Sequence, residues 1–484
     1  MNIQQLSSSR RAFIKNTALA TAGLAFSQCA FAGAPVDYTY LSIAQLSVLI
    51  RNKKVSPVEI TKACLKRIEF LNPKLNAFIT VTGDQALKEA RIAETEIRKG
   101  KWKGPLHGIP IALKDNIDTE GILTTAASGV YKNRIPTEDA DIVIRLKKAG
   151  AIIIGKNNLH EFALGTTSQI SFFGVVRNPW NSDYIPGGSS GGSGAAVAAG
   201  MCYASIGTDT GGSIRLPAAC CGLTGFKPTY GLISIRGIIP VIQSIDHAGP
   251  ICRTVEDAAI LMNVLAIPLS EQNNCKTDYR TFFNRTKNPR IGIMNNYKAS
   301  NEVNEIFRNV ISTFHSVGYK TSDIELPMLP SSVVGDAEIE AYHRPLLNQF
   351  KDLYDPVTFN DINSPKTISS MDYINDMNKM ETDRNTISKK LFKNIDVLIL
   401  PTTASLTPTI DVAKSKGPFA LSDENTWPFN HYGLPAISIP CGFDKNGMPV
   451  GLQIVGPRWG EVKVLDIAQR FQKHTSWHLK HPLI

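Results

Sequence analysis

A segment composed almost entirely of small residues, from position 186 to position 224, constrains the fold of this chain more than any other feature. Two glycine- and serine-rich turns, residues 187–194 and 211–213, lie on either side of an alanine-rich helical pattern and a short apolar strand pattern. Glycine lets the backbone adopt positive φ and approach other groups closely. A turn that leads into a helix also exposes amide N–H groups, which can hold an anion or a developing oxyanion. Because a helix and a strand follow at once, a flexible linker is the wrong interpretation.

Three common glycine motifs do not fit this segment. A phosphate-binding loop would require the pattern GxxxxGK[ST], and its lysine is missing. A dinucleotide fingerprint would require GxGxxG after a strand, with an acid about 20 residues later, and the first turn does not match it. A GxSxG nucleophile elbow is also absent, because Ile214 and Arg215 follow Ser213.

Hydrophobic patterns elsewhere alternate between helices and strands. Helical patterns cover residues 41–52, 58–70, 83–99, 140–149 and 461–473. Apolar strand patterns cover residues 109–114, 151–155, 203–207, 397–400, 436–440 and 451–455. This rhythm predicts an α/β layer architecture with a largely buried sheet.

Composition and charge narrow the class of protein. The 484 residues are 43% hydrophobic and 19% charged, which is typical of a soluble globular protein with a sizeable core. The formal net charge is +10, or about +7 without the first 32 residues, which contain no acid. Lysines and arginines are scattered, with no run of five or more, so we interpret them as a solvated surface and expect no nucleic-acid partner.

The N-terminus resembles a twin-arginine signal peptide. Arg10 and Arg11 precede the apolar segment 17–26, and Ala30–Ala32 fit an A-x-A cleavage site. Such signals direct export of folded proteins in bacteria, so we expect residues 1–32 to be removed and residues 33–484 to be periplasmic or secreted. The alternative is an uncleaved anchor. No later apolar run approaches the roughly 20 residues that span a bilayer, so we expect no stable membrane association after processing.

The cysteines suggest neither a zinc site nor a disulfide framework, because they are widely spread without a CxxC pair. The adjacent Cys220 and Cys221 are the exception in spacing, and a vicinal disulfide between them would be strained. We expect most cysteines to be small buried residues.

The glycine-rich segment resembles the signature of the amidase signature family, in residues 187–194 and again in residues 207–215. Residues 104–118, 155–162 and 433–457 are also similar to that family. The resemblance covers roughly residues 38–265 and 395–475. It implies one amidase domain over residues 33–484, built on a large, mixed, mostly parallel central sheet with helices on both faces. The segment around 265–395 carries little of the resemblance, and we expect it to be a variable region that forms the substrate pocket or a lid.

The resemblance also implies a catalytic triad of serine, cis-serine and lysine. By position, Lys114 matches the base, Ser189 the bridging serine with a cis peptide bond before it, and Ser213 the nucleophile. A serine hydroxyl needs a base that removes its proton as it attacks. Lysine serves only when it is neutral, and burial lowers its pKa by disfavouring the charged form. The apolar residues 109–113 before Lys114 suit such burial.

Further roles follow from the same resemblance. Ser190 is expected to hydrogen-bond within the triad, and Asp209 and Arg215 to support the second turn. The oxyanion hole is expected from the backbone amides of Thr210, Gly211, Gly212 and Ser213. The sequence gives no Ser–His–Asp context to His107, His160 or His247, which we interpret as structural.

The sequence therefore predicts an exported amidase that hydrolyses a carboxamide through an acyl-enzyme on Ser213, without metal or organic cofactor. The alternatives are a glutaminase subunit of a glutamyl-tRNA amidotransferase-like complex, with partners, and a catalytically silent binding protein. A homodimer is compatible with the sequence.

The middle segment, residues 330–395, is either a lid over the pocket or further scaffold. Aromatic residues here and near the C-terminus hint at an aryl or apolar acyl group, as in indoleacetamide and mandelamide hydrolases. These are Tyr342, Phe350, Tyr354, Phe359, Tyr373, Trp427 and Phe429, together with the loop 126–131.

Overall fold

The computed structural model describes residues 38–484 except 268–277, 282–285, 330 and 365–366. Residues Tyr38–Ile484 group as one compact unit. The expected signal peptide in residues 1–32 lies outside the described residues, as does Cys275. In the described part of the chain, no helix combines the length and the apolar character needed to cross a bilayer.

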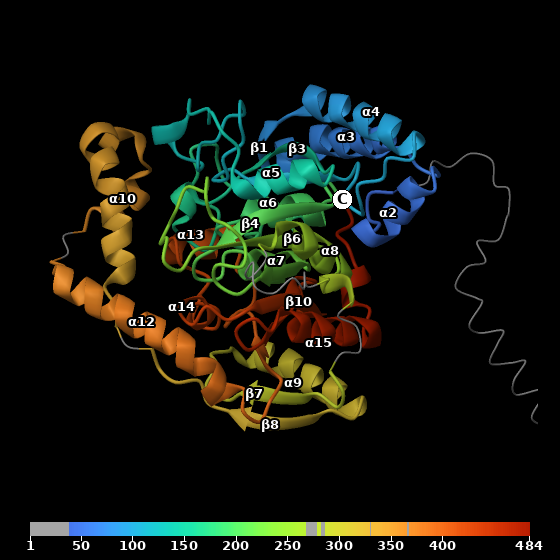
Figure 1. Cartoon of the computed structure of the whole chain (residues 1–484). Helices are drawn as coiled ribbons and strands as arrows, with labels where there is room; N and C mark the ends of the chain where they lie inside the picture. The colour runs from blue at the N-terminus through green and yellow to red at the C-terminus, as the bar shows by residue number, and fades with distance from the viewer. Residues whose placement is uncertain (1–37, 268–277, 282–285, 330, 365–366) are drawn as a thin grey trace, which may run out of the picture. The chain divides into compact units, whose positions relative to one another are not determined.

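The described strands form one eleven-stranded sheet in the order β1-β3-β2-β4-β6-β5-β10-β11-β9-β7-β8. Their bounds are β1 Phe78–Val81, β2 Pro110–Lys114, β3 Ile152–Asn157, β4 Ala204–Asp209, β5 Thr224–Lys227, β6 His247–Cys252, β7 Arg290–Met294, β8 Lys320–Ile324, β9 Val397–Pro401, β10 Ala436–Phe443 and β11 Pro449–Val455. Helices flank this mixed sheet (Figure 1), which confirms the predicted fold class.

The strand directions correct one part of that prediction. The pairs β2–β3, β2–β4, β7–β8 and β7–β9 are parallel. The other recorded pairs of described strands are antiparallel, so the sheet is mixed but not mostly parallel. The connections explain this, because a short turn joins β10 to β11 and no helix separates β5 from β6, whereas parallel neighbours need a crossover.

The helices of the described residues include the five that the sequence predicted with bounds, whose ends differ by a few residues. They are α2 Ile43–Arg51, α3 Pro57–Leu75, α4 Gly83–Arg98, α5 Asp141–Lys148, α6 Gly191–Ala198, α7 Arg215–Cys221, α8 Val255–Leu265, α9 Asn301–Ser316, α10 Val334–Phe350, α11 Pro356–Ile362, α12 Ser370–Leu391, α13 Ile410–Lys416, α14 Pro428–His431 and α15 Glu461–His474. The small-residue helix α6 packs on β4 and on α7, which itself packs on β5, β10 and β11. Strands β2, β3, β4, β9 and β11 bury every residue, so both of their faces are covered.

The middle segment is mainly helical. Helices α10 and α12 lie beside the main body in Figure 1, and they carry few buried residues. Buried Arg384 of α12 joins this segment to the body, because its guanidinium donates to the backbone oxygens of His431 and Ser244 at 2.9 and 2.8 Å.

Candidate active site

Lys114 ends strand β2 and is completely buried. Its Nζ donates to Ser189 Oγ and to Thr208 Oγ1, both at 2.7 Å. Burial lowers the pKa of Lys114 to about 7, while the carboxylates of Asp246 and Asp209 act in the opposite direction. An amine with this pKa is partly neutral near pH 7, so it can accept a proton from a hydroxyl group.

Ser189 lies in the loop that leads into α6, and the peptide bond Gly188–Ser189 is cis. The structure thus has the cis bond that the resemblance implied. The loop fits tightly against its neighbours, because a Cβ on Gly188 would lie 2.6 Å from the carbonyl carbon of Thr166. Glycine is therefore required there for steric reasons.

Ser213 lies between the end of β4 at Asp209 and the start of α7 at Arg215, and it faces a cavity. Among the described residues no hydrogen bond joins Ser213 Oγ to Ser189 Oγ. The two loops meet instead through the backbone, where Ser190 N donates to the carbonyl oxygen of Ser213 at 3.3 Å. The expectation that the Ser190 side chain bonds within the triad is wrong, because Ser190 Oγ donates to the Thr208 carbonyl oxygen at 3.2 Å.

The loop before α7 presents free amide donors. In the part of the chain that the structure describes, no acceptor is recorded for the backbone N–H groups of residues 210–213. Gly212 has a φ of +143°, and a Cβ there would lie 2.4 Å from Thr426 Oγ1. Donors held in this way around a serine hydroxyl can stabilise an oxyanion.

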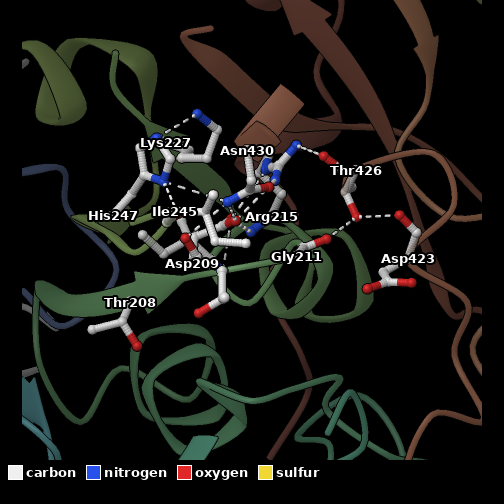
Figure 2. Close-up of polar contacts among 12 residues, drawn as sticks. Thr208, Asp209, Gly211, Arg215, Lys227, Ile245, His247, Asp423, Thr426 and Asn430 are labelled. Carbon is white, nitrogen blue, oxygen red and sulfur yellow. Dashed lines mark hydrogen bonds and ion pairs between the residues drawn. The ribbon is translucent and has the colours of Figure 1, made fainter. Parts of the chain in front are cut away.

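A buried ion pair holds both ends of this loop (Figure 2). The Arg215 guanidinium donates to the two carboxylate oxygens of Asp209 at 3.0 and 2.8 Å, and both side chains are completely buried. Asp209 also accepts from the amide of Ile214 at 3.1 Å. Neither side chain lines the cavity, so the pair supports the loop rather than contacting a substrate.

The segment around α14 also supports the Ser213 loop, and the sequence did not indicate this. Asn430 Nδ2 donates to Asp209 at 2.8 Å, and Thr426 Oγ1 donates to the carbonyl oxygen of Gly211 (Figure 2). The Thr426 carbonyl oxygen in turn accepts from Arg215 at 2.9 Å. No local pattern indicates these contacts, because they join residues more than 200 positions apart.

A cavity of about 410 Å³ opens over Ser213, with Thr210 and Gly211 in its wall. Six aliphatic side chains of the wall come from the segment before β6 and from α10 and α12. These apolar side chains are Val241, Ile242, Ile245, Val334, Ile339 and Met380. The middle segment therefore contributes directly to the pocket.

The aromatic residues are placed differently from the prediction. Trp427 lines the cavity as expected, but Phe429 is completely buried in a separate apolar cluster. Tyr342 and Tyr354 pack with Phe162 away from it, and Ala126 of the 126–131 loop is buried with them. Tyr342 and Tyr354 are unavailable to the cavity because their rings pack between the middle segment and the main body.

The three histidines have structural contacts. His107 pairs with Glu96 at 2.9 Å, and His160 Nδ1 accepts from Ser168 N at 3.2 Å. The contacts of His247 specify one tautomer, in which Nδ1–H donates to the Ile245 carbonyl oxygen at 2.7 Å and Nε2 accepts from Lys227 at 3.2 Å. Cys220 and Cys221 are free and buried, and no described disulfide joins them.

The structure thus brings the loop of Ser213 against the loop of Ser189, which hydrogen-bonds to the buried Lys114, and the comparisons with known proteins give the family of the chain. The Amidase family model matches residues 59–465. The chain belongs to the amidase family with the amidase signature. Enzymes of this family hydrolyse carbon–nitrogen bonds.

Three proteins illustrate the similarity. The chain is 37% identical to a glutamyl-tRNA(Gln) amidotransferase subunit of Marinomonas sp., over 91% of this chain and 98% of that protein. The corresponding protein of Thermotoga maritima is 32% identical in its crystal structure, with a TM-score of 0.73 over 91% of this chain and 96% of that one. The peptide amidase of Stenotrophomonas maltophilia is 28% identical, with a TM-score of 0.75 over 91% and 98%.

Proposed function

We propose that the chain hydrolyses a carboxamide to a carboxylate and ammonia or an amine, through an acyl-enzyme on Ser213. The observation that carries this proposal is the buried hydrogen bond from Lys114 Nζ to Ser189 Oγ, in a loop that contacts the Ser213 loop, whose Ser213 lines the cavity. In this scheme the Ser213 hydroxyl attacks the amide carbon while its proton passes by way of Ser189 to neutral Lys114. The proton then returns to the leaving nitrogen, and water hydrolyses the ester.

The backbone amides of residues 210–213 would stabilise the oxyanion that forms on the amide oxygen. Loss of one such donor typically lowers kcat by about 100- to 1000-fold. The Asp209–Arg215 ion pair joins the two ends of this loop, and Thr426 Oγ1 donates to the Gly211 carbonyl oxygen within it. These contacts hold the backbone of the loop, so its amide donors keep their positions.

The pocket suggests the substrate class. Asp423 lines the cavity with Ser213, and no ion pair with a lysine or arginine is recorded for it among the described residues. Its carboxylate lies near the loop, since a Cβ on Gly211 would be 2.6 Å from Asp423 Oδ2. Burial raises the pKa of Asp423 to about 6, so the group is still mostly ionised at pH 7. We therefore infer an amide whose acyl part carries an ammonium group, such as an amino-acid amide.

The comparisons favour glutamine as the amide. The curated relatives are subunits of glutamyl-tRNA(Gln) amidotransferases, and this chain covers 98% of the Marinomonas protein. This similarity supports the glutaminase subunit more directly than it supports a free-standing amidase. A glutaminase of this kind would work with partner proteins and pass on ammonia.

The free-standing, exported amidase remains the second candidate. The observation that favours it is the twin-arginine-like N-terminus with Arg10 and Arg11. An exported chain would act outside the cytosol, where translation does not take place. The two candidates share the chemistry at Ser213 and differ in substrate and partners.

The test is ammonia release by purified residues 33–484 from glutamine, asparagine, amino-acid amides, and neutral aliphatic and aryl amides. Ser213→Ala should abolish turnover, whereas Ser415→Ala, on the exposed surface of α13, should not change it. Asp423→Asn should raise the KM for amides with an ammonium group by about tenfold and leave neutral amides unchanged. No turnover on any amide by folded protein would support the silent binding protein. Glutamine turnover only after addition of partner proteins would support the glutaminase.

A further inference from the structure

Asp246 is a buried carboxylate beside the candidate active site, one residue before strand β6. It is 5% exposed and does not itself line the cavity. Its neighbours in the chain do, because Val241, Ile242 and Ile245 form part of the apolar wall. The carboxylate therefore lies behind the pocket wall.

The contacts of Asp246 join two functional segments. Thr210 Oγ1, from the loop with the free amides, donates to Asp246 Oδ1 at 2.6 Å. The amide of Val241 donates to Oδ2 at 2.8 Å, and the amide of Ile242 donates to Oδ1 at 3.3 Å. One side chain thus holds the first residue of the loop around Ser213 and the apolar pocket wall together.

The same wall is fixed from its outer side by the middle segment. Ser244 N donates to Glu338 of α10 at 3.0 Å, and the Ser244 carbonyl oxygen accepts from Arg384 of α12 at 2.8 Å. Residues 241–246 therefore lie between the helices that complete the pocket and the loop that carries Ser213. Asp246 is the side chain that links this wall to Thr210.

We infer that Asp246 is a positioning residue that couples the acyl-binding wall to the oxyanion loop through Thr210. The inference rests on the proposed function, because it deals with the same site. Asp246 does not touch the reacting atoms, so its effect on the reaction is indirect.

Asp246 also influences the base. Its negative charge raises the pKa of Lys114, against the larger effect of burial. The other charged or titratable groups that act on these two are Asp209 and His160, which face Lys114, and Tyr230, which faces Asp246. Removal of the Asp246 charge should lower the pKa of Lys114, so the base stays neutral at lower pH.

The experiment measures kcat and KM from pH 5 to 9 for wild type, Asp246→Asn and Asp257→Asn. Asp257 is a matched control, because it is a completely buried carboxylate on α8 that accepts from the Ala44 amide, away from the site. We expect Asp246→Asn to lower kcat by about 10-fold or more and to move the acidic limb of kcat/KM at least about half a unit to lower pH. Asp257→Asn should leave the limb in place.

Thr210→Val removes the tether and keeps the Asp246 carboxyl group, so it should lower kcat at pH 8 to 9. The comparison is made at that pH because the Thr210 hydrogen bond also lowers the pKa of Asp246, which burial raises to about 6. This variant also tests the inference if Asp246→Asn does not fold. The rate of Ser213 labelling by a fluorophosphonate gives the same profiles when no substrate is known. An unchanged kcat and an unmoved limb in Asp246→Asn, with wild type active, would overturn the inference alone. A wild-type chain that is folded but neither turns over amides nor labels would overturn the proposed function, and the inference with it.

Discussion

Two lysines on neighbouring strands show how differently a buried amine can be used. Lys114 ends β2, and Lys156 lies beside its neighbour Leu113 on the parallel strand β3. Both side chains are completely buried, and burial lowers the pKa of each. In position and burial the two residues are nearly equivalent.

Their partners are different. Lys114 Nζ contacts two hydroxyl groups, those of Ser189 and Thr208. Lys156 Nζ donates to the Ile117 carbonyl oxygen and to Thr124 Oγ1 at 2.6 Å each, and its ion pair with Asp115 Oδ1 measures 3.5 Å. A carboxylate keeps a lysine charged, whereas hydroxyl groups accept either form. Burial alone therefore does not identify a base, and the type of partner does.

The largest expected effect is the loss of activity in Lys114→Met. Methionine preserves the volume and removes the amine, so Ser213 loses its base and kcat should fall by roughly 1000-fold or more. Lys114→Met should remain folded, since among the described residues Lys114 Nζ contacts hydroxyl groups and no ion pair is recorded for it. Ammonia release and thermal unfolding measured on the same sample check both statements. Near-normal turnover in a folded Lys114→Met variant would contradict the proposal that Lys114 is the base and Lys156 is structural.

Lys156→Met should instead lower the stability of the fold, and its effect on the chemistry at Ser213 should be secondary. Asp115 would be left buried without its cation, which typically costs about 3–5 kcal/mol of unfolding free energy. Urea denaturation measures this loss. The double variant Lys156→Met with Asp115→Asn should be more stable than the single variant, because the uncompensated charge is gone. Equal stability of the two variants would show that the ion pair is not the reason.

The smallest effect is expected from Thr208→Val, which removes one of the two hydroxyl acceptors of Lys114. A single hydrogen bond contributes about 0.5–1.5 kcal/mol net, so kcat should fall by about 2- to 12-fold. Ser205→Ala on the same strand is the control, since its hydroxyl group donates to Asn157 and does not contact Lys114. A loss as large as in Lys114→Met would mean that Thr208 has a role in proton transfer.

The sequence predicted the elements near the glycine-rich turns well, because that segment has little freedom. The helix before β4, the strand itself and the turn at Ser213 lie where the small residues required them. The apolar run before Lys114 does not by itself single it out as the proposed base, since residues 152–154 give Lys156 a similar context. Only the resemblance to a family separated the two lysines.

The pocket and the loop supports could not be predicted in the same way. Thr426, Asn430 and Asp246 reach the Ser213 loop across long stretches of chain, and contacts of this kind leave no local periodicity. The aromatic residues of the middle segment hint at an aryl-binding pocket, yet Tyr342 and Tyr354 pack elsewhere. The prediction of a mostly parallel sheet was wrong for a related reason, because helix and strand patterns do not specify which strands become neighbours.

The most direct test of the account is to identify the covalent intermediate. Wild type and Ser213→Ala would be mixed with an activated ester of an amino acid, quenched with acid within seconds, and mapped by peptide mass spectrometry. The account predicts an acyl adduct on the peptide that contains Ser213, none in the variant, and faster formation as the pH rises through about 7, where Lys114 becomes neutral. An adduct on another residue, or an equal amount of adduct in Ser213→Ala, would contradict it.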